Sequence, residues 1–70
     1  MNTNISFYLN GHKFSSNSKL RITDILHYFN YKNSLFIIEY NNLIYDPKEW
    51  STIKIKSNDK IEVIGIVGGG

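Results

Sequence analysis

Cysteine is absent from this 70-residue sequence, and proline, tryptophan and arginine each occur once. Without cysteine the chain has no disulfide, no thiolate nucleophile and no thiolate ligand for zinc or an iron–sulfur cluster. No apolar run approaches the ~20 residues that a membrane-spanning helix needs, so we expect no membrane partner. Residues 1–4 are polar and lack the pattern of a targeting peptide, so we expect the chain to stay in the compartment where it is made.

The motifs of catalysis are missing as well. His12 and His27 are the only histidines, and neither has a second ligand at a metal-binding spacing. No GxSxG, GxGxxG or P-loop pattern occurs. The net charge of +2 is mild, and the lysines form no basic stripe, so we expect no nucleic-acid partner. We therefore predict a protein that is not an enzyme, with no catalytic residue, metal or bound cofactor.

The composition fits one small domain. Apolar residues make up 41% of the chain, enough for one compact core and little more. We predict a folded domain over residues 1–67 and a flexible tail over residues 68–70. Asn, Ile and Lys are abundant and have AT-rich codons, which indicates an AT-rich bacterial or organellar gene. The expected location is therefore the cytoplasm, or the plastid stroma if an organelle encodes the chain.

Hydrophobic periodicity predicts an α+β fold. Period-2 alternation and turn signals predict strands over residues 5–9, 12–15, 35–40, 43–45 and 61–67, with weak alternation over 52–56. Asn10-Gly11 predicts a tight hairpin. Apolar residues at i, i+3, i+4 and i+7 predict a helix over residues 22–29, capped by Thr23 or starting two residues earlier. Pro47 begins a one-turn segment whose Trp50 is expected to cover one end of the core.

These elements follow the order β-β-α-β-β, with a short irregular segment before the final strand. A right-handed crossover would place the first and last strands side by side and parallel in the centre of a mixed sheet. The sheet would pack on the one helix.

Two features stand out against the lack of catalytic motifs. The first is the run Gly68, Gly69 and Gly70 directly after the last strand. Glycine has no side chain, so the run can lie in a narrow channel and bring the terminal carboxylate to a reacting centre. Activation as an acyl-adenylate would make that carboxylate open to attack by a nucleophile.

The second feature is excess apolar surface on the predicted sheet. If Ile61 faces the helix, alternation turns Ile64 and Ile66 to the opposite face. If Leu35 and Ile37 face the helix, Phe36 and Ile38 are also turned outward. We therefore predict a partner-docking patch, preferred over simple scatter of exposed apolar residues. Its members would be Tyr8, Phe36, Ile38, Ile64 and Ile66.

The whole chain resembles the ThiS-type sulfur carriers of thiamine biosynthesis, which have the ubiquitin-like β-grasp fold. The residues that carry the resemblance are Leu9-Asn10-Gly11, Ile22, Asp24, Ile25, Leu26, the span from Ile44 to Trp50, Asp59, Ile61-Glu62-Val63 and Val67-Gly68-Gly69-Gly70. Arg21 departs from a helix-capping Thr, and Gly65 departs from a larger residue in the last strand.

The resemblance implies a carrier. A ThiF-type adenylating enzyme would use ATP and magnesium to convert the Gly70 carboxylate to an acyl-adenylate. Sulfur would then replace AMP to give a thiocarboxylate, and thiazole synthase would take up that sulfur. The alternatives are a MoaD-type carrier for molybdenum cofactor synthesis, a ubiquitin-like protein modifier, and an RNA- or protein-binding module whose tail has no role.

Overall fold

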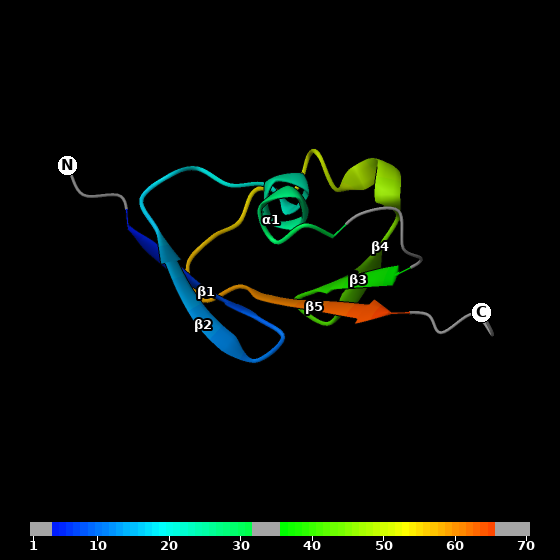
Figure 1. The fold of residues 1–70 in the computed structure, drawn as a ribbon, viewed down its shortest axis with the longest axis horizontal. Coiled ribbons are helices and arrows are strands. Elements are labelled where there is room, and N and C mark those ends of the chain that lie inside the picture. Colours follow the sequence, from blue (N-terminus) through cyan, green and yellow to red (C-terminus); the bar gives the residue numbers. More distant parts are fainter. Residues whose placement is uncertain (1–3, 32–35, 66–70) are drawn as a thin grey trace.

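The computed structural model describes residues 4–31 and 36–65. These residues form five strands, one α-helix and one turn of 3₁₀ helix (Figure 1). The elements are β1 (Ile5–Leu9), β2 (His12–Ser16), α1 (Ile22–Tyr28), β3 (Phe36–Tyr40), β4 (Leu43–Tyr45), η1 (Pro47–Glu49) and β5 (Lys60–Gly65). The predicted strand bounds agree with these to within about a residue wherever the chain is described.

The strands form one mixed sheet in the order β2-β1-β5-β3-β4. β1 and β5 are adjacent and parallel, as the crossover rule predicted, and the other neighbours are antiparallel. Asn10 and Gly11 both have positive φ in the β1–β2 turn, which is the conformation that made this pair a hairpin signal. The predicted α+β class is confirmed, and the predicted β-β-α-β-β order is followed by the 3₁₀ turn η1 and a fifth strand, β5.

The helix α1 lies across one face of the sheet (Figure 1). Arg21, not Thr23, is its N-cap residue. The Asp24 carboxylate accepts a 2.8 Å hydrogen bond from the Arg21 backbone N–H. The acidic side chain in the first turn thus provides an acceptor for the backbone N–H of the N-cap residue. The first of the two predicted caps is therefore wrong, and the earlier start is correct.

The core lies between α1 and the sheet. Its buried members are Phe7, Leu9, Ile22, Ile25, Leu26, Ile38, Ile55 and Ile61. Trp50 covers one end, as predicted: its ring stacks on Phe36 with centroids 5.3 Å apart, and its Nε1–H donates to the Tyr45 carbonyl oxygen. These elements are held together by packing and hydrogen bonds, without a disulfide, because the sequence has no cysteine.

The weakly alternating segment at residues 52–56 is not a strand. It makes only an isolated antiparallel bridge between Lys54 and Arg21. The bridge is flanked by backbone hydrogen bonds from Ile22 N to Ile53 O and from Ile55 N to Leu20 O. This segment therefore ties the entry of the helix to the core, because Ile55 is itself buried.

Candidate functional site

The candidate site is organised around β5, the strand that leads into the terminal glycines. β5 lies between β1 and β3 in the middle of the sheet. The description of the chain ends at Gly65, so the predicted sulfur-carrying residue Gly70, the tail residues Gly68 and Gly69, and the predicted patch residue Ile66 lie outside the described residues. The described structure therefore shows how the strand before the tail is held and what surrounds it.

The start of β5 is fixed by a buried carboxylate. Asp59 is only 7% exposed. Its Oδ1 accepts a hydrogen bond from Asn41 Nδ2 at 3.0 Å, and its Oδ2 accepts from the Lys56 backbone N–H and from the Tyr40 hydroxyl. A buried carboxylate satisfied by several donors holds its neighbours in one geometry. We call Asp59, Tyr40, Asn41 and the Lys56 backbone the Asp59 cluster.

The Asp59 cluster reaches β5 directly. The Asn41 side-chain oxygen accepts from the Lys60 backbone N–H at 2.8 Å, and the Asn41 N–H donates to the Lys60 carbonyl oxygen at 2.8 Å. On the other side, Tyr8 N–H donates to the Asp59 carbonyl oxygen. The first residue of β5 is thus tied both to the β3–β4 turn and to β1.

Tyr40 is part of this arrangement because of its hydroxyl. Burial raises the pKa of Tyr40 well above its usual range, and the hydrogen bond to Asp59 and the charges of Asp59 and Tyr45 act in the same direction. Each cause disfavours a phenolate beside a carboxylate. Tyr40 therefore acts as a neutral donor that stabilises the fold.

Asn10 holds the middle of β5. Its backbone N–H donates to the Ile61 carbonyl oxygen at 2.9 Å, and its side-chain Oδ1 accepts from the Val63 N–H at 2.8 Å. β1 ends at Leu9, so the Asn10 side chain continues the hydrogen-bond ladder one step beyond the strand. The sequence predicted only a turn at Asn10. Its hydrogen bond to Val63 was missed because nothing in the sequence signals that contact.

The end of β5 has fewer neighbours. Ile64 and Gly65 pair with Ile37 and Phe36 of β3, while the described pairing with β1 stops at Ile61. Ile64 is 44% exposed, and a Cβ added at Gly65 would meet no atom within 4 Å. Within the described residues, the end of β5 is therefore paired with β3 and not with β1.

The predicted facing of β5 is correct, but that of β3 is wrong by one residue. Ile38 is 0% exposed and belongs to the core, and Phe36 packs against the core and Trp50. The cause is register: Ile38 is paired with Val63, and directly paired residues share a face of the sheet. Phe36 and Ile38 are therefore not part of an exposed patch.

The apolar residues of the outer face are instead the half-buried Ile37 and the exposed Ile44 and Ile64, which we call the outer patch. Ile37 and Ile64 are direct partners, and Ile44 lies on the neighbouring strand β4, where it is 67% exposed. Ile37 and Ile44 were missed because alternation within one strand leaves two possible facings, and only the pairing with β5 decides between them.

Tyr8 also faces outward, but away from the outer patch. Its partner on β5 is Lys60, four positions before Ile64 and thus ~13 Å along the strand. Glu62 and Glu39 occupy the space between and are directly opposite each other. Like charges on directly paired residues repel each other. The two carboxylates form an acidic border beside the outer patch.

The described residues bring together no group of three or more His, Asp or Glu side chains that could hold a metal ion. His12 and His27 are both exposed and belong to different elements. In the described parts of the chain, no helix has the length and apolar character required to cross a membrane.

Comparisons with known proteins agree with the resemblance seen in the sequence. The ThiS family matches residues 3–70. "Uncharacterized protein ycf40" of Trieres chinensis is 43% identical over 65 residues, covering 93% of this chain and 89% of the relative. The protein of the same name from Porphyra purpurea is 33% identical over 70 residues, covering 100% of this chain and 99% of the relative.

A solved structure has the same fold. The crystal structure of the thiamine biosynthesis protein ThiS from Geobacter metallireducens superimposes with a TM-score of 0.79 at 19% identity. The match covers 94% of this chain and 100% of that one. The predicted β-grasp fold is confirmed.

Proposed function

The chain belongs to the ThiS family, and from this premise we propose that it is a sulfur carrier whose active group is the Gly70 carboxylate. The observation that carries the proposal is the construction of β5: a central strand, clamped at its start by the Asp59 cluster, leads into three consecutive glycines. A small domain that presents its own terminus needs no catalytic side chain.

The chemistry follows from the carboxylate. A carboxylate is a poor acyl donor because its oxygen leaves badly. In the proposed route a ThiF-type enzyme, with ATP and magnesium, joins a Gly70 oxygen to the α-phosphorus of ATP and releases pyrophosphate. A sulfur nucleophile, formally sulfide, then attacks the acyl carbon and AMP departs with that oxygen, which leaves a thiocarboxylate. Thiazole synthase would accept this sulfur for the thiazole of thiamine.

The absence of cysteine fits this route. A thiolate in the same chain would compete for the activated acyl group, since thiolates are strong nucleophiles. A thiocarboxylate also stores sulfur on the chain without a persulfide.

We propose the outer patch as the docking surface for the activating enzyme. It combines three apolar side chains with the acidic border of Glu39 and Glu62, and it includes Ile64, the neighbour of the last described residue. An apolar partner surface with basic groups at its edge would cover the patch and relieve the repulsion between the two carboxylates.

The first test separates the tail from the domain. With a ThiF-type enzyme and ATP, pyrophosphate release should be lost when Gly69 and Gly70 are deleted, and also when one residue is added after Gly70. Both variants should melt at nearly the temperature of the original chain. Continued release from the extended chain would contradict the assignment to Gly70, because its carboxylate would then be an internal amide.

The second test uses two isoleucines on opposite faces. Ile64→Asp should leave the fold intact, with a stability change of roughly 0.5 kcal/mol, and should weaken binding to the activating enzyme. Ile38→Asp should unfold the domain because it buries an unpaired charge. Unchanged partner binding by a folded Ile64→Asp would reject the outer patch as the docking surface.

The acceptor of the sulfur distinguishes the thiamine route from a carrier for molybdenum cofactor synthesis, and formation of an isopeptide bond would identify a protein modifier. All three share activation of the terminus. The abundance of Asn, Ile and Lys, which have AT-rich codons, supports an organellar or bacterial gene, so the proposed location is the plastid stroma or the cytoplasm.

A further inference from the structure

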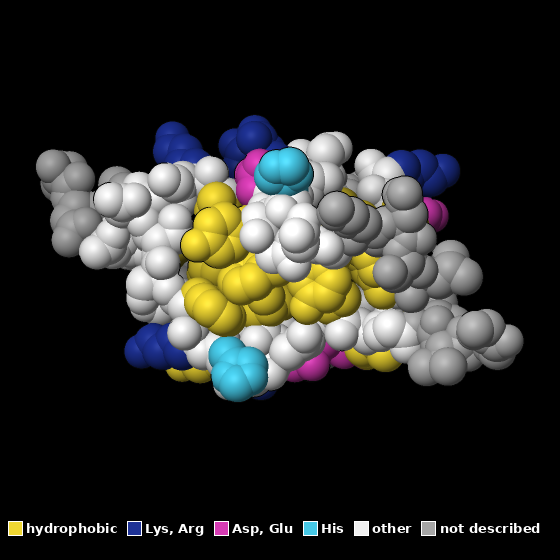
Figure 2. All heavy atoms as spheres, viewed as in Figure 1, with side chains coloured by type: hydrophobic (Ala, Val, Ile, Leu, Met, Phe, Trp, Pro, Cys, Tyr) yellow, Lys and Arg dark blue, Asp and Glu magenta, His cyan; other side chains and the backbone are white. Residues whose placement is uncertain are grey.

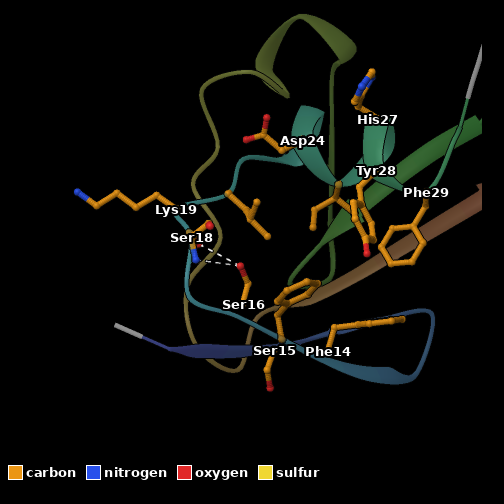
Figure 3. Close-up of a pocket in the computed structure, with 12 residues that line it drawn as sticks. Phe14, Ser15, Ser16, Ser18, Lys19, Asp24, His27, Tyr28 and Phe29 are labelled. Atoms are coloured by element: carbon orange, nitrogen blue, oxygen red, sulfur yellow. Dashed lines mark hydrogen bonds between the residues drawn. The ribbon is translucent and has the colours of Figure 1, made fainter. Parts of the chain in front are cut away.

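A second surface lies at the opposite edge of the sheet, between β2 and α1. The side chains of Phe7, Phe14, Leu20, Ile25, Tyr28 and Phe29 line a hollow of about 530 Å³, which we call the β2–α1 groove. Figure 3 shows Tyr28 and Phe29 reaching from the helix toward Phe14 on β2. The ring centroids of Phe14 and Phe29 are 5.1 Å apart, and Tyr28 is 81% exposed.

Apolar side chains reach the molecular surface on this side of the domain (Figure 2). Figure 2 shows hydrophobic side chains gathered below the helix on the face seen in Figure 1. Phe14, Leu20 and Phe29 are only partly buried beside this hollow, and an apolar hollow that stays partly open on a small domain is a candidate interaction site. The outer patch of Ile37, Ile44 and Ile64 lies on the other face of the sheet, so the two surfaces are separate.

One wall of the groove is an open strand edge. β2 is the terminal strand of the sheet, and none of the described residues forms a strand beyond it. Tyr8 and Asn10 direct their N–H groups to β5, so Phe7 and Leu9 bond to Phe14 and His12 of β2.

The alternation of an antiparallel ladder then turns the backbone N–H and C=O of Lys13 and Ser15 away from β1. These groups form a row of donors and acceptors beside the apolar hollow. An extended segment could pair with this row and place every second side chain into the hollow, which is the geometry of strand addition.

We propose that the β2–α1 groove binds an extended acidic segment of a partner protein, which adds to the sheet as a strand beside β2. Apolar side chains of the segment enter the groove, and the intervening side chains emerge on the outer face beside Lys13, which is directly opposite Tyr8. Lys19 stands at one end of the groove (Figure 3). Acidic residues at the outward positions complement Lys13, and an acidic residue at the end of the segment complements Lys19.

Charge also decides against a second copy of this chain as the occupant. Pairing of two β2 edges would bring two Lys13 side chains into one small area, and an edge lysine is a known obstacle to such pairing. Among the described residues lining the groove, Asp24 carries the one carboxylate, and it already accepts the Arg21 N–H. With Lys13 on the strand edge and Lys19 at the end of the groove, two lysines stand against one carboxylate, and the net charge of these three side chains is positive.

The test uses the full chain labelled with ¹⁵N and two synthetic peptides. One is acetyl-Asp-Ile-Asp-Val-Asp-Ile-Asp-amide, and the other has Lys in place of every Asp. The acidic peptide should shift resonances of β2 and α1 at concentrations up to about 1 mM, and it should slow hydrogen exchange at the Lys13 and Ser15 amides. The basic peptide should bind at least about tenfold more weakly.

A matched pair of variants tests strand addition itself. Ser15→Pro removes an outward N–H that the sheet does not use, a position where an edge strand tolerates proline. It should weaken binding about tenfold or more through lost main-chain hydrogen bonds. Ser15→Ala keeps the N–H and should bind within about twofold of the original chain. Should Ser15→Pro fail to fold, slowed exchange at Lys13 and Ser15 in the unmodified chain gives the same answer.

Three results would overturn the proposal: no resonance shift at the highest concentration, shifts confined to the outer patch, or equal binding of the acidic and basic peptides. A concentration-dependent dimer lost in Ser15→Pro would identify a second copy as the occupant instead. The proposal does not rest on sulfur transfer, because peptide binding is read without activation of Gly70. A chain that fails activation but binds the peptide would reject only the proposed function.

Discussion

The two ends of β5 are built differently. At its start, Asp59 is buried and accepts hydrogen bonds from three groups, and Lys60 is bonded to Asn41 on both its N–H and its C=O. At its end, Ile64 and Gly65 pair only with β3 among the described strands, and both are exposed. One strand thus passes from a buried polar clamp to open surface within six residues.

The residues that stabilise the fold and the residues of the proposed chemistry therefore lie at opposite ends of one strand. The Asp59 cluster fixes the start of β5, and it lies away from the residues that a partner enzyme would bind. Changes at the start should therefore cost stability, and changes at the end should cost little. The predictions below test that gradient, from the largest expected effect on stability to the smallest.

Asp59→Ala should be the most damaging of these substitutions. The Tyr40 hydroxyl can still donate to the Lys54 carbonyl oxygen, so two donors, the Asn41 amide and the Lys56 N–H, lose their acceptor, at ~1–3 kcal/mol for each unsatisfied group. We expect the free energy of unfolding, measured with urea, to fall by roughly 2–4 kcal/mol. Asp59→Asn keeps one acceptor oxygen and should lose less. A loss smaller than that of Asn10→Ala would contradict the conclusion that the Asp59 cluster holds the start of β5.

Asn10→Ala should have an intermediate effect. The Val63 N–H loses its acceptor, and alanine must adopt a positive φ at a position where Asn has a φ of 50°. We expect a loss of about 1–2 kcal/mol in the same urea measurement. Asn10→Asp keeps both an acceptor oxygen and tolerance of that conformation, so it should be nearly neutral. Equal losses in the two variants would show that the hydrogen bond to Val63 contributes nothing.

The Tyr40 hydroxyl predicts a dependence on pH. Its pKa in the folded chain is raised above the ordinary value of about 10, so folding favours the protonated form. The stability that this group contributes is fully present below pH ~10 and is lost as the pH rises toward the folded pKa. The advantage of the original chain over Tyr40→Phe should therefore shrink above pH ~10 in urea titrations. A constant difference in unfolding free energy between the two chains across that pH range would contradict a raised pKa of Tyr40 in the folded chain.

Gly65→Ala should have the smallest effect. The added Cβ meets no atom within 4 Å, and Gly65 lies in a strand, where glycine is a weak former. We expect a change in the free energy of unfolding within about 0.5 kcal/mol, of either sign. A loss comparable with that of Asn10→Ala would mean that the end of β5 is held as firmly as its middle.

Much of the fold follows from short-range patterns. The alternation in β1, the Asn10-Gly11 turn and the i, i+3, i+4, i+7 spacing of α1 each identified its element, and the crossover rule predicted the parallel pairing of β1 with β5. These patterns work because they express the period of one element. What they leave open is how that element meets its neighbours.

The errors and omissions in the site have that cause. Ile37 and Ile38 are both apolar, so alternation in β3 fits either facing, and only the register with Val63 places Ile38 in the core. Asn41 and Asp59 are 18 residues apart, and their hydrogen bond depends on the packing of two separate turns. The glycine tail needed no such information, because its proposed role rests on the lack of side chains.

The central claim is that sulfur is carried on Gly70, and intact mass spectrometry tests it most directly. The full chain is incubated with a ThiF-type enzyme, ATP, magnesium and a sulfur source, and then digested to locate the change. The account predicts that one oxygen is replaced by sulfur in the terminal peptide, and that the change disappears when thiazole synthase and its substrates are added. Sulfur on an internal residue, or an unchanged terminus while a known ThiS protein is converted in parallel, would contradict it.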